Sequence, residues 1–330
     1  MRVLVVKLSS LGDVIHTLPA ITDAAVALPG VRFDWVVEEA FAEIPAWHPA
    51  VDRVIPVALR RWRRRPLRDF RGPEWRRARE ALRKTRYDAL IDAQGLIKSA
   101  FIARLVKAPR YGMDRHSARE GLAAAVYHHR IAVPRDMHAV ERSRRLFARA
   151  LHYRSGPGQG AYGLDLRRGS ALVQEPVLLF FHGTARAEKL WPEQHWRELV
   201  QYAGRAGFRV WLPWGDEAEH ERARCIAGAD DCAEVLPRLS LSQLAQRLLQ
   251  VRAAVAVDTG LGHLAAALDV PAVSLYGPTS TRLVGTYGGH QVHIQSPLAG
   301  DRRADPRAQM QAIEPAAVWE AVEQLPAVSG

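Results

Sequence analysis

The chain has 330 residues, of which 48% are hydrophobic, and its formal net charge is +11. This length exceeds the size at which a single hydrophobic core stops growing, so two domains are expected. No apolar run reaches the roughly 20 residues of a membrane-spanning helix, and the first run is too short for a signal peptide, so a cytoplasmic protein is expected.

Short apolar runs typical of strands alternate with helical patterns along the whole chain. Apolar residues at i, i+3 and i+4 spacing predict helices over 193–206 and 241–249, and a helix that begins with proline is predicted over 315–325. The alternation is typical of an α/β protein whose parallel sheets are covered by helices on both faces. The predicted strands are 3–6, 33–37, 54–57, 89–91, 177–181, 210–212, 254–257 and 272–275.

A break in this alternation lies near the middle of the chain. It contains Ser-Gly-Pro-Gly-Gln-Gly and Arg-Arg-Gly-Ser and shows no sustained apolar period. Such a stretch is typical of a linker between two α/β domains. We therefore predict a first domain over 1–155, a linker over 156–175, a second domain over 176–312 and a C-terminal helix region over 313–330.

The chain opens with a buried-type strand, a polar turn and a helix. Ser9, Ser10, Gly12 and Asp13 therefore lie at the carboxyl end of a strand, where open α/β sheets bind ligands. The turn has neither the G-x-G-x-x-G spacing of a dinucleotide loop nor the pattern of a P-loop. Asp13 stands where a helix N-cap is expected, so it either caps the helix or acts as a general base for a hydroxyl nucleophile.

Most of the net charge lies between residues 60 and 86. Thirteen Arg or Lys residues stand there against three acidic residues, which gives this segment a local net charge of +10. A solvated helix face explains the arginines of 76–83. A solvated helix face does not explain the run Arg60-Arg-Trp-Arg-Arg-Arg65, because its guanidinium groups repel one another unless an anion is nearby. We expect an anionic partner, which is a nucleic acid, an anionic membrane surface or a phosphorylated substrate.

Two strand ends in the second half carry hydroxyl groups, glycines and charges. The strand 177–181 leads into His-Gly-Thr184 and then Lys189, and the strand 254–257 leads into Asp258-Thr-Gly-Leu-Gly-His263 and a helix over 263–268. Free amides at a helix N-terminus suit an anion, and a lysine can neutralise a leaving phosphate. These strand ends converge on one edge of the sheet, which favours a ligand site there.

Each of these features also has an ordinary interpretation when it is taken alone. Asp258 and Thr259 are then helix caps, and His263 is a residue of the first turn. Lys189 is a surface lysine, and Glu219 is part of an acidic helix start that suits the helix dipole. The two cysteines, Cys225 and Cys232, have neither metal-site spacing nor a histidine cluster beside them, so neither a metal site nor a disulfide framework is predicted.

Six segments of the chain match a known family, namely 7–19, 33–39, 60–63, 91–96, 189–196 and 258–263. On these segments the chain resembles the lipopolysaccharide heptosyltransferase I family, and the resemblance extends over essentially its full length. The resemblance implies a GT-B fold, in which two Rossmann-like domains face each other across a cleft and the terminal helix returns to the first domain. It also implies an inverting transfer of L-glycero-D-manno-heptose from ADP-heptose to the first Kdo sugar of Kdo2-lipid A, through an oxocarbenium-like transition state and with no cofactor or metal.

The resemblance also implies roles for individual residues. Asp13 matches the catalytic aspartate that deprotonates the acceptor hydroxyl, and Lys189 matches the lysine that stabilises charge as ADP departs. Asp258 would hold heptose hydroxyls, and Glu219 would hold the ribose. The contacts on the phosphate side would be Thr184, Thr259, Gly260 and His263, and those on the acceptor side would be Ser10, Gly12, Arg60, Arg61, Arg63, Arg64 and Arg119.

This chain departs from the family pattern at two places. Ala185 stands where relatives carry a second threonine, which would alter the donor contacts. Arg65 and Arg68 enlarge the basic run and would strengthen binding to an anionic membrane leaflet. The resemblance thus implies a monomer that binds peripherally to the cytoplasmic face of the inner membrane.

Three other interpretations stay open. Heptosyltransferase II uses the same donor but acts on the first heptose, and the segment Arg60-Arg-Trp-Arg63 favours the first enzyme. A nucleic-acid-binding protein would use the segment 60–86, but the chain has no RNP motif, zinc finger or helix-turn-helix, so no nucleic acid partner is expected. An inactive GT-B scaffold is disfavoured by the presence of Asp13, Lys189 and Asp258.

Overall fold

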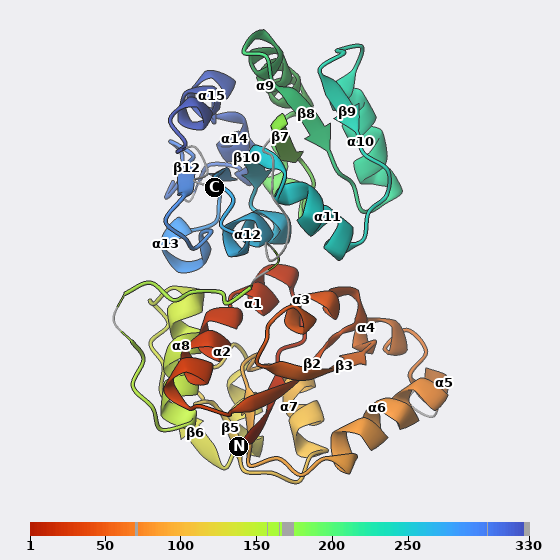
Figure 1. The fold of residues 1–330 in the computed structure, drawn as a ribbon, viewed down its shortest axis with the longest axis vertical. Coiled ribbons are helices and arrows are strands. Elements are labelled where there is room, and N and C mark those ends of the chain that lie inside the picture. Colours follow the sequence, from red (N-terminus) through yellow and green to blue (C-terminus); the bar gives the residue numbers. More distant parts are fainter. Residues whose placement is uncertain (70–71, 157, 165, 167–174, 302, 327–330) are drawn as a thin grey trace. The chain divides into compact units, whose positions relative to one another are not determined.

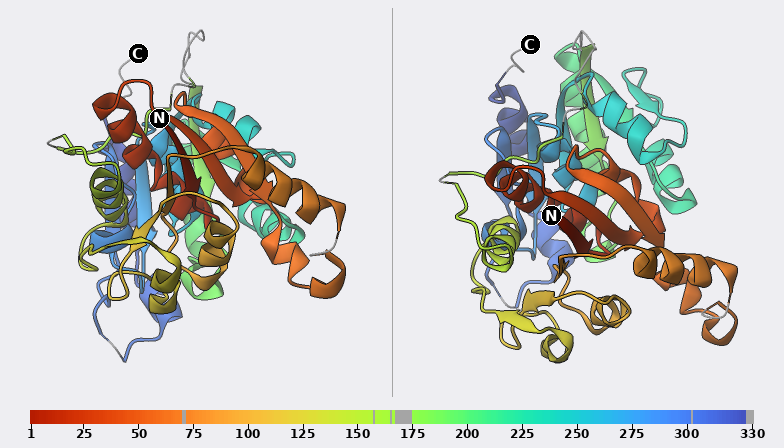
Figure 2. Two further views of the ribbon diagram at one scale, coloured as in Figure 1. Left: turned by 90° about the horizontal axis from the view of Figure 1, so that it is seen from below. Right: turned by 60° about the horizontal axis from the view of Figure 1, so that its bottom comes forward.

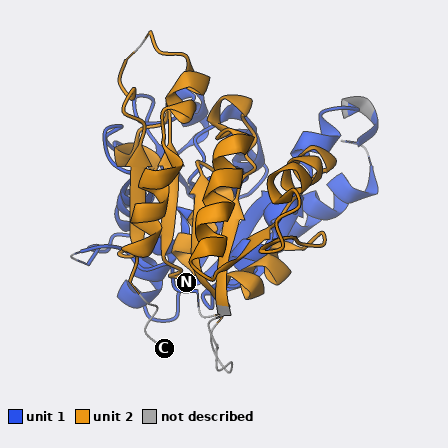
Figure 3. Cartoon of the chain, turned by 90° about the horizontal axis from the view of Figure 1, so that it is seen from above, with its two compact units in different colours: residues 1–165 blue, residues 166–330 orange. Residues whose placement is uncertain are grey.

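The computed structural model describes residues 1–69, 72–156, 158–164, 166, 175–301 and 303–326. The chain divides into two compact units, residues 1–165 and residues 166–330 (Figure 3). Each unit is built on a parallel sheet of six strands with helices packed against it. The predicted α/β class with two parallel sheets is confirmed. The division between the units falls inside the segment 156–175.

The sheet of the first unit has the strand order β3-β2-β1-β4-β5-β6. This order is that of a doubly wound sheet, in which the direction of winding reverses between β1 and β4. Ligands of such sheets bind outside the carboxyl ends of the strands at this switch point. The strands are β1 (Arg2–Val6), β2 (Arg32–Glu38), β3 (Val51–Val57), β4 (Ala89–Asp92), β5 (Arg110–Met113) and β6 (His129–Ile131).

Helices cover both faces of this sheet (Figure 1, Figure 2). On one face Leu4 and Val6 of β1 pack with Trp75 and Leu82 of α6 and with Ile102 of α7. On the other face the ring of Phe33 in β2 meets that of Phe147 in α8, which also packs against α2. The helices are α1 (Leu11–Ile15), α2 (Leu18–Ala27), α3 (Glu43–Ala46), α4 (Leu59–Trp62), α5 (Pro66–Asp69), α6 (Pro73–Lys84), α7 (Ile97–Arg104) and α8 (Ala139–Ala150), with the 3-10 helices η1 (Glu39–Phe41) and η2 (Gly121–Val126).

The second unit repeats this topology. Its strand order, β12-β11-β10-β7-β8-β9, places the switch point between β7 and β10. The strands are β7 (Glu175–Phe181), β8 (Arg209–Leu212), β9 (Ala233–Val235), β10 (Val251–Val257), β11 (Ala272–Tyr276) and β12 (Gln291–Gln295). The helices are η3 (Ala187–Lys189), α9 (Glu193–Arg205), α10 (Glu217–Ala227), α11 (Leu241–Leu248), α12 (Gly260–Ala267), α13 (Thr281–Val284), α14 (Pro306–Gln311) and α15 (Pro315–Glu323). Within the described ranges, no helix is long and apolar enough to span a membrane.

The terminal helix α15 belongs to the second unit. Its Val318 and Val322 join the core of that unit, and its Trp319 stacks on Tyr202 of α9 with ring centroids 6.2 Å apart. The apolar stripe of α15 packs on the sheet and helix of its own unit, against β11 and α9. The expected return of the C-terminal region toward the first domain stays a prediction.

Trp196 lies at the centre of the core of the second unit. It is fully buried, and its ring lies 5.0 Å from that of Trp191 and 5.4 Å from that of Phe180. We expect Trp196→Ala to lower the free energy of unfolding by about 3–5 kcal/mol, because it removes a large side chain and leaves a cavity. Urea unfolding followed by circular dichroism measures the loss.

Val26→Ala is the control for this prediction, because it also shortens an apolar side chain but at an exposed position. It is expected to change the stability by no more than about 0.5 kcal/mol. A Trp196→Ala protein as stable as the Val26→Ala protein would contradict the packing described here.

Candidate active site

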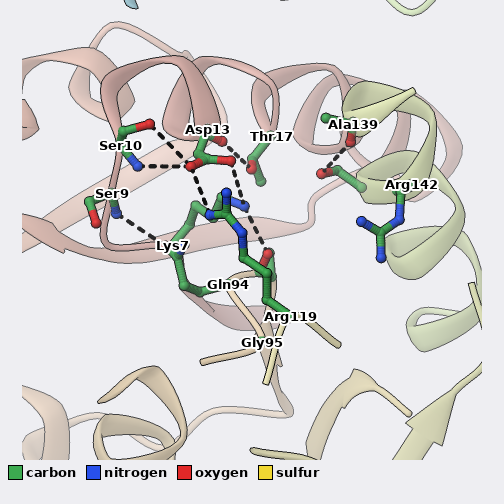
Figure 4. A network of polar contacts seen from close by, with 12 residues as sticks. Lys7, Ser9, Ser10, Asp13, Thr17, Gln94, Gly95, Arg119, Ala139 and Arg142 are labelled. Atoms are coloured by element: carbon green, nitrogen blue, oxygen red, sulfur yellow. Dashed lines mark hydrogen bonds and ion pairs between the residues drawn. The ribbon is translucent and has the colours of Figure 1, made fainter. Parts of the chain in front are cut away.

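Asp13 lies in the first turn of α1, directly after β1 (Figure 4). The N-cap of α1 is Ser10, and Asp13 is the third residue of the helix, so the expectation that Asp13 is the N-cap is wrong. Its carboxylate accepts hydrogen bonds from the N–H of Ser10 at 3.0 Å and from the hydroxyl of Ser10 at 3.1 Å. Asp13 therefore fixes the start of the helix from within it, and Gly12 is buried in the same turn.

Two cations lie beside the carboxylate of Asp13. Lys7 Nζ is 3.9 Å from Oδ1, and Arg119 Nη1 is 3.5 Å from Oδ2. Burial opposes ionisation of Asp13, but the charge of Lys7, the hydrogen bond from the N–H of Ser10 and the charge of Arg119 outweigh it and lower the pKa of Asp13. The carboxylate is therefore ionised at neutral pH. Its side chain is 24% exposed, which leaves room for a substrate hydroxyl.

The segment after β4 holds the polar turn in place. Gln94 Oε1 accepts hydrogen bonds from the N–H groups of Leu8 and Ser9, and Lys7 Nζ donates one to the carbonyl of Ala93 at 2.9 Å. Lys7 and Gln94 were not predicted as site residues. The pairing of β4 with β1 could have indicated them. Two parallel neighbouring strands end on the same side of the sheet, so the segment after β4 must lie beside the segment after β1.

Arg61, in the basic run, is paired within the first unit. Its Nη2 lies 3.1 Å from Glu39 Oε2 and 2.8 Å from Glu74 Oε2, and these hydrogen bonds raise the pKa of its guanidinium. The guanidinium of Arg60 lies over the ring of Phe41, 5.5 Å from its centroid. Folding therefore neutralises part of the basic run, because it brings Glu39 from a separate part of the sequence to Arg61.

The basic run connects to the Asp13 turn through α7. Lys98 Nζ donates a hydrogen bond to Ser9 Oγ at 3.2 Å. Burial and the charges of Arg60 and Arg63 lower the pKa of Lys98. Arg63 and Arg64 follow α4 and are exposed. Of the predicted acceptor-side residues, the structure thus places Ser10, Gly12 and Arg119 at Asp13, and Arg60 and Arg63 near Lys98.

In the second unit, Lys189 and Asp258 meet at the switch point between β7 and β10. Lys189 Nζ lies 2.5 Å from Asp258 Oδ2, and Thr184 Oγ1 donates a hydrogen bond to the carbonyl of Asp258 at 3.0 Å. The side chains of the ion pair are only 17% and 10% exposed. Lys189 is therefore not an idle surface lysine, and the carboxylate of Asp258 pairs with it.

The helix α12 follows Asp258. Its N-cap is Thr259 and its first residue is Gly260, three residues before the predicted start at His263. Within the described part of the chain, the side chain of Thr259 makes no capping hydrogen bond. His263 is the fourth residue of this helix, and its side chain is buried. The first amides of α12 therefore lie next to the Lys189–Asp258 pair.

Glu219 reaches the same edge of the sheet from α10. Its Oε2 accepts a hydrogen bond from the N–H of Gly215 at 2.8 Å. A Cβ atom at Gly183, at the end of β7, would lie 2.3 Å from Glu219 Oε1, so the carboxylate packs directly against the glycine backbone. Burial raises the pKa of Glu219. The structure thus brings Thr184, Lys189 and Asp258 together at one edge of the sheet, where Glu219 also lies.

A family model described as glycosyltransferase family 9 (heptosyltransferase) matches residues 75–313. Lipopolysaccharide heptosyltransferase 1 of Pseudomonas aeruginosa is 57% identical over 298 residues, which are 90% of this chain and 84% of the relative. The chain belongs to glycosyltransferase family 9. Lipopolysaccharide heptosyltransferase 2 of Salmonella typhimurium, by contrast, is 25% identical over 298 residues, which are 85% of this chain and 84% of that protein.

Solved structures of family 9 agree with this assignment. Escherichia coli heptosyltransferase WaaC with ADP has a TM-score of 0.90 and 45% identity, and the match covers 98% of this chain and 99% of that one. The same enzyme with ADP-2-deoxy-2-fluoro heptose has a TM-score of 0.87 and 44% identity, with the same coverage. The family and the GT-B fold that the resemblance implied are therefore confirmed, and the chain is a glycosyltransferase.

Proposed function

We propose that this chain transfers L-glycero-D-manno-heptose from ADP-heptose to the first Kdo sugar of Kdo2-lipid A, in the synthesis of the lipopolysaccharide inner core. The observation that carries this proposal is the pair of switch points. One holds an ionised carboxylate with room for a hydroxyl, and the other holds a lysine beside the first turn of a helix. Identity of 57% to a heptosyltransferase 1, against 25% to a heptosyltransferase 2, supports the first acceptor over the second.

The first unit would bind the acceptor and supply the base. Asp13 takes the proton of the acceptor hydroxyl while that oxygen forms a bond to the anomeric carbon. Attack from the side opposite the leaving ADP inverts the configuration of that carbon. Arg119 lies beside Asp13 and would meet acidic groups of the acceptor near the reacting hydroxyl, whereas Arg63 and Arg64 would meet groups further away.

The second unit would bind the donor. Lys189 supplies positive charge as the bond from the anomeric carbon to the diphosphate breaks. The amides of α12, with Thr184, Thr259, Gly260 and His263, form the phosphate side of the site. Glu219 accepts hydrogen bonds from the ribose hydroxyls, and Asp258, held by Lys189, accepts those of the heptose hydroxyls. We also propose that the enzyme works as a monomer, peripheral on the anionic cytoplasmic face of the inner membrane.

The decisive experiment compares two acceptors. ADP release from ADP-heptose is measured with Kdo2-lipid A, with the same lipid already bearing its first heptose, and without acceptor. We expect release above the acceptor-free rate with Kdo2-lipid A alone, and a product heavier by one heptose. Release only with the heptosylated lipid would assign the chain to the second transfer. No release with either lipid would overturn the proposal.

Lys7 gives a pH test of the proposed base. The transfer needs ionised Asp13, whose pKa is lowered, so activity should be lost on the acid side only below the ordinary pKa of an aspartate. Lys7→Met removes the positive charge that lies 3.9 Å from Oδ1. The pKa of Asp13 should then rise, and the acid limb of the kcat/KM profile should move to higher pH by about one unit or more.

Lys107→Met removes a lysine from the exposed surface of the first unit and is the control for this shift. Its kcat/KM profile should match that of the unsubstituted enzyme. An acid limb that stays in place in Lys7→Met would mean that the Asp13 carboxylate does not limit the rate on the acid side.

A further inference from the structure

Exposed apolar side chains gather on one part of the first unit. Ile97 and Phe101 are 53% and 46% exposed, and Leu122 is 77% exposed. Ile97 and Phe101 lie one turn apart on α7 and share a face of the helix. Leu122 belongs to η2, which packs against α7 through Ala100 and Ala123. Scattered exposed apolar residues are ordinary, but a group of them marks an interaction surface. We call these three residues the α7 ridge.

The α7 ridge borders the basic segment. Phe101 stacks on Trp75 of α6 with ring centroids 5.9 Å apart, and Trp75 meets Trp62 of α4 at 5.6 Å. Accordingly, α6 and α7 lie side by side in Figure 1. The buried face of α6 consists of Trp75, Ala78 and Leu82. Its other faces turn basic side chains to the solvent, namely Arg76, Arg77, Arg79, Arg83 and Lys84.

We propose that the α7 ridge, the exposed Arg63 and Arg64 that follow α4 and the exposed arginines of α6 together form a docking surface for an anionic lipid bilayer. The apolar side chains enter the boundary between headgroups and acyl chains, and the guanidinium groups bind anionic headgroups, as in interfacial amphipathic segments. The chemistry favours lipid over a single-stranded nucleic acid, because Ile97 and Leu122 are aliphatic and offer no ring on which a base stacks.

The position of this surface gives it a use in the proposed transfer. On α7, Lys98 follows Ile97 directly and reaches Ser9 Oγ in the Asp13 turn. The bilayer-docking surface is therefore adjacent to the proposed acceptor site. If the acceptor is a lipid, as the proposed function requires, its sugar would be presented to Asp13 while its acyl chains stay in the membrane. This use rests on the proposed function, which also includes peripheral attachment to a membrane; the location of the lipid-binding surface rests on the exposed residues themselves.

Vesicle sedimentation with the purified full-length chain tests the docking surface. The vesicles contain phosphatidylcholine alone or phosphatidylcholine with phosphatidylglycerol. We expect salt-sensitive binding to the anionic vesicles only, and a partition coefficient about tenfold lower or more for the triple variant Ile97→Ser, Phe101→Ser, Leu122→Ser. The matched control replaces three exposed apolar residues elsewhere, Val26→Ser, Val292→Ser and Leu298→Ser, and should bind like the unsubstituted chain.

A smaller variant tests whether lost binding reflects lost folding. The double variant Ile97→Ser, Leu122→Ser leaves the stack of Phe101 on Trp75 intact and should lose part of the binding with no change in thermal unfolding. Ridge variants that bind as tightly as the control, or equal binding to uncharged vesicles, would overturn the docking surface.

Activity separates the docking surface from the proposed function. With a deacylated, soluble acceptor the triple variant should turn over normally, and with vesicle-embedded acceptor its turnover should fall with its binding. A slow rate on both acceptors would mean that the substitutions act on the site itself and would overturn the docking role. Ridge-dependent vesicle binding without transfer by the unsubstituted chain would overturn the proposed function and leave the docking surface standing.

Discussion

Replacing Asp13 by asparagine is expected to reduce the turnover of heptose transfer by about 10²–10⁴-fold, the range that general bases contribute. Asparagine has nearly the same shape, and its amide oxygen still accepts the hydrogen bond that the N–H of Ser10 donates at 3.0 Å. It cannot, however, take a proton from the acceptor hydroxyl. Turnover is measured as ADP release at saturating ADP-heptose and acceptor. Calorimetry should show unchanged ADP binding, because the proposed donor contacts belong to the second unit.

This substitution also decides between the two interpretations of Asp13. If Asp13 only fixes the start of α1, asparagine should preserve both the helix and the activity, because it accepts the same hydrogen bond. Asp305→Asn makes the same exchange at the N-cap of α14, where Asp305 accepts a hydrogen bond from the N–H of Arg307. That control should keep full turnover. An Asp13→Asn enzyme that keeps more than a tenth of its turnover would exclude Asp13 as the base.

Most strands that the sequence predicted have apolar residues on both faces; the exception is β3, which lies at the edge of its sheet and is only partly buried. β1, β2, β7 and β10 lie inside the sheets, and nearly all of their side chains are buried. The sequence analysis missed β5, β6, β9 and β12, and all but β5 lie at the edge of a sheet. Edge strands keep exposed polar side chains such as His129 and Arg130 of β6. Their hydrogen bonds depend on a neighbouring strand that local composition does not reveal.

The candidate site was predictable wherever a polar turn follows a buried strand. Asp13 and Asp258 were found in this way, because Asp258 directly follows the apolar strand β10 and Asp13 lies in the helix start that follows β1 and its polar turn. Pairings between distant segments could not be found. Arg61 looked unpaired in the sequence, but Glu39 and Glu74 reach it only after the chain folds. Local sequence therefore indicates which residues lie at the carboxyl ends of the strands. Tertiary structure decides which of the charges are already neutralised within the protein.

The two units use the same topology for different electrostatic tasks. At the switch point of the first unit, a carboxylate is surrounded by cations that keep it ionised. At the switch point of the second unit, a lysine is held by a carboxylate next to the start of a helix. A transfer reaction needs both a group that removes a proton and a group that stabilises the leaving diphosphate. In the proposed function, the first unit would supply the former and the second unit the latter.

Lys189→Met is expected to lower turnover by about 10²–10³-fold, because the charge that develops on the departing diphosphate loses its cation. It should also weaken ADP binding. The substitution leaves the carboxylate of Asp258, which is 10% exposed, without its ammonium partner, so the free energy of unfolding should fall by about 1–3 kcal/mol. ADP release, calorimetry and urea unfolding measure the three effects separately.

The double variant Lys189→Met, Asp258→Asn separates catalysis from stability. In this variant both residues are neutral, so no unpaired charge is left in the protein interior. Stability should therefore return toward that of the unsubstituted chain, whereas turnover should stay low. Arg209→Met breaks an exposed ion pair with Glu234 in the same unit, and as a control it should alter neither quantity appreciably. A Lys189→Met enzyme that binds ADP with full affinity and keeps more than a tenth of its turnover would show that the role of Lys189 is only to pair with Asp258. Restored stability together with a turnover lower than that of the single variant Asp258→Asn would place the charge of Lys189 in the reaction itself.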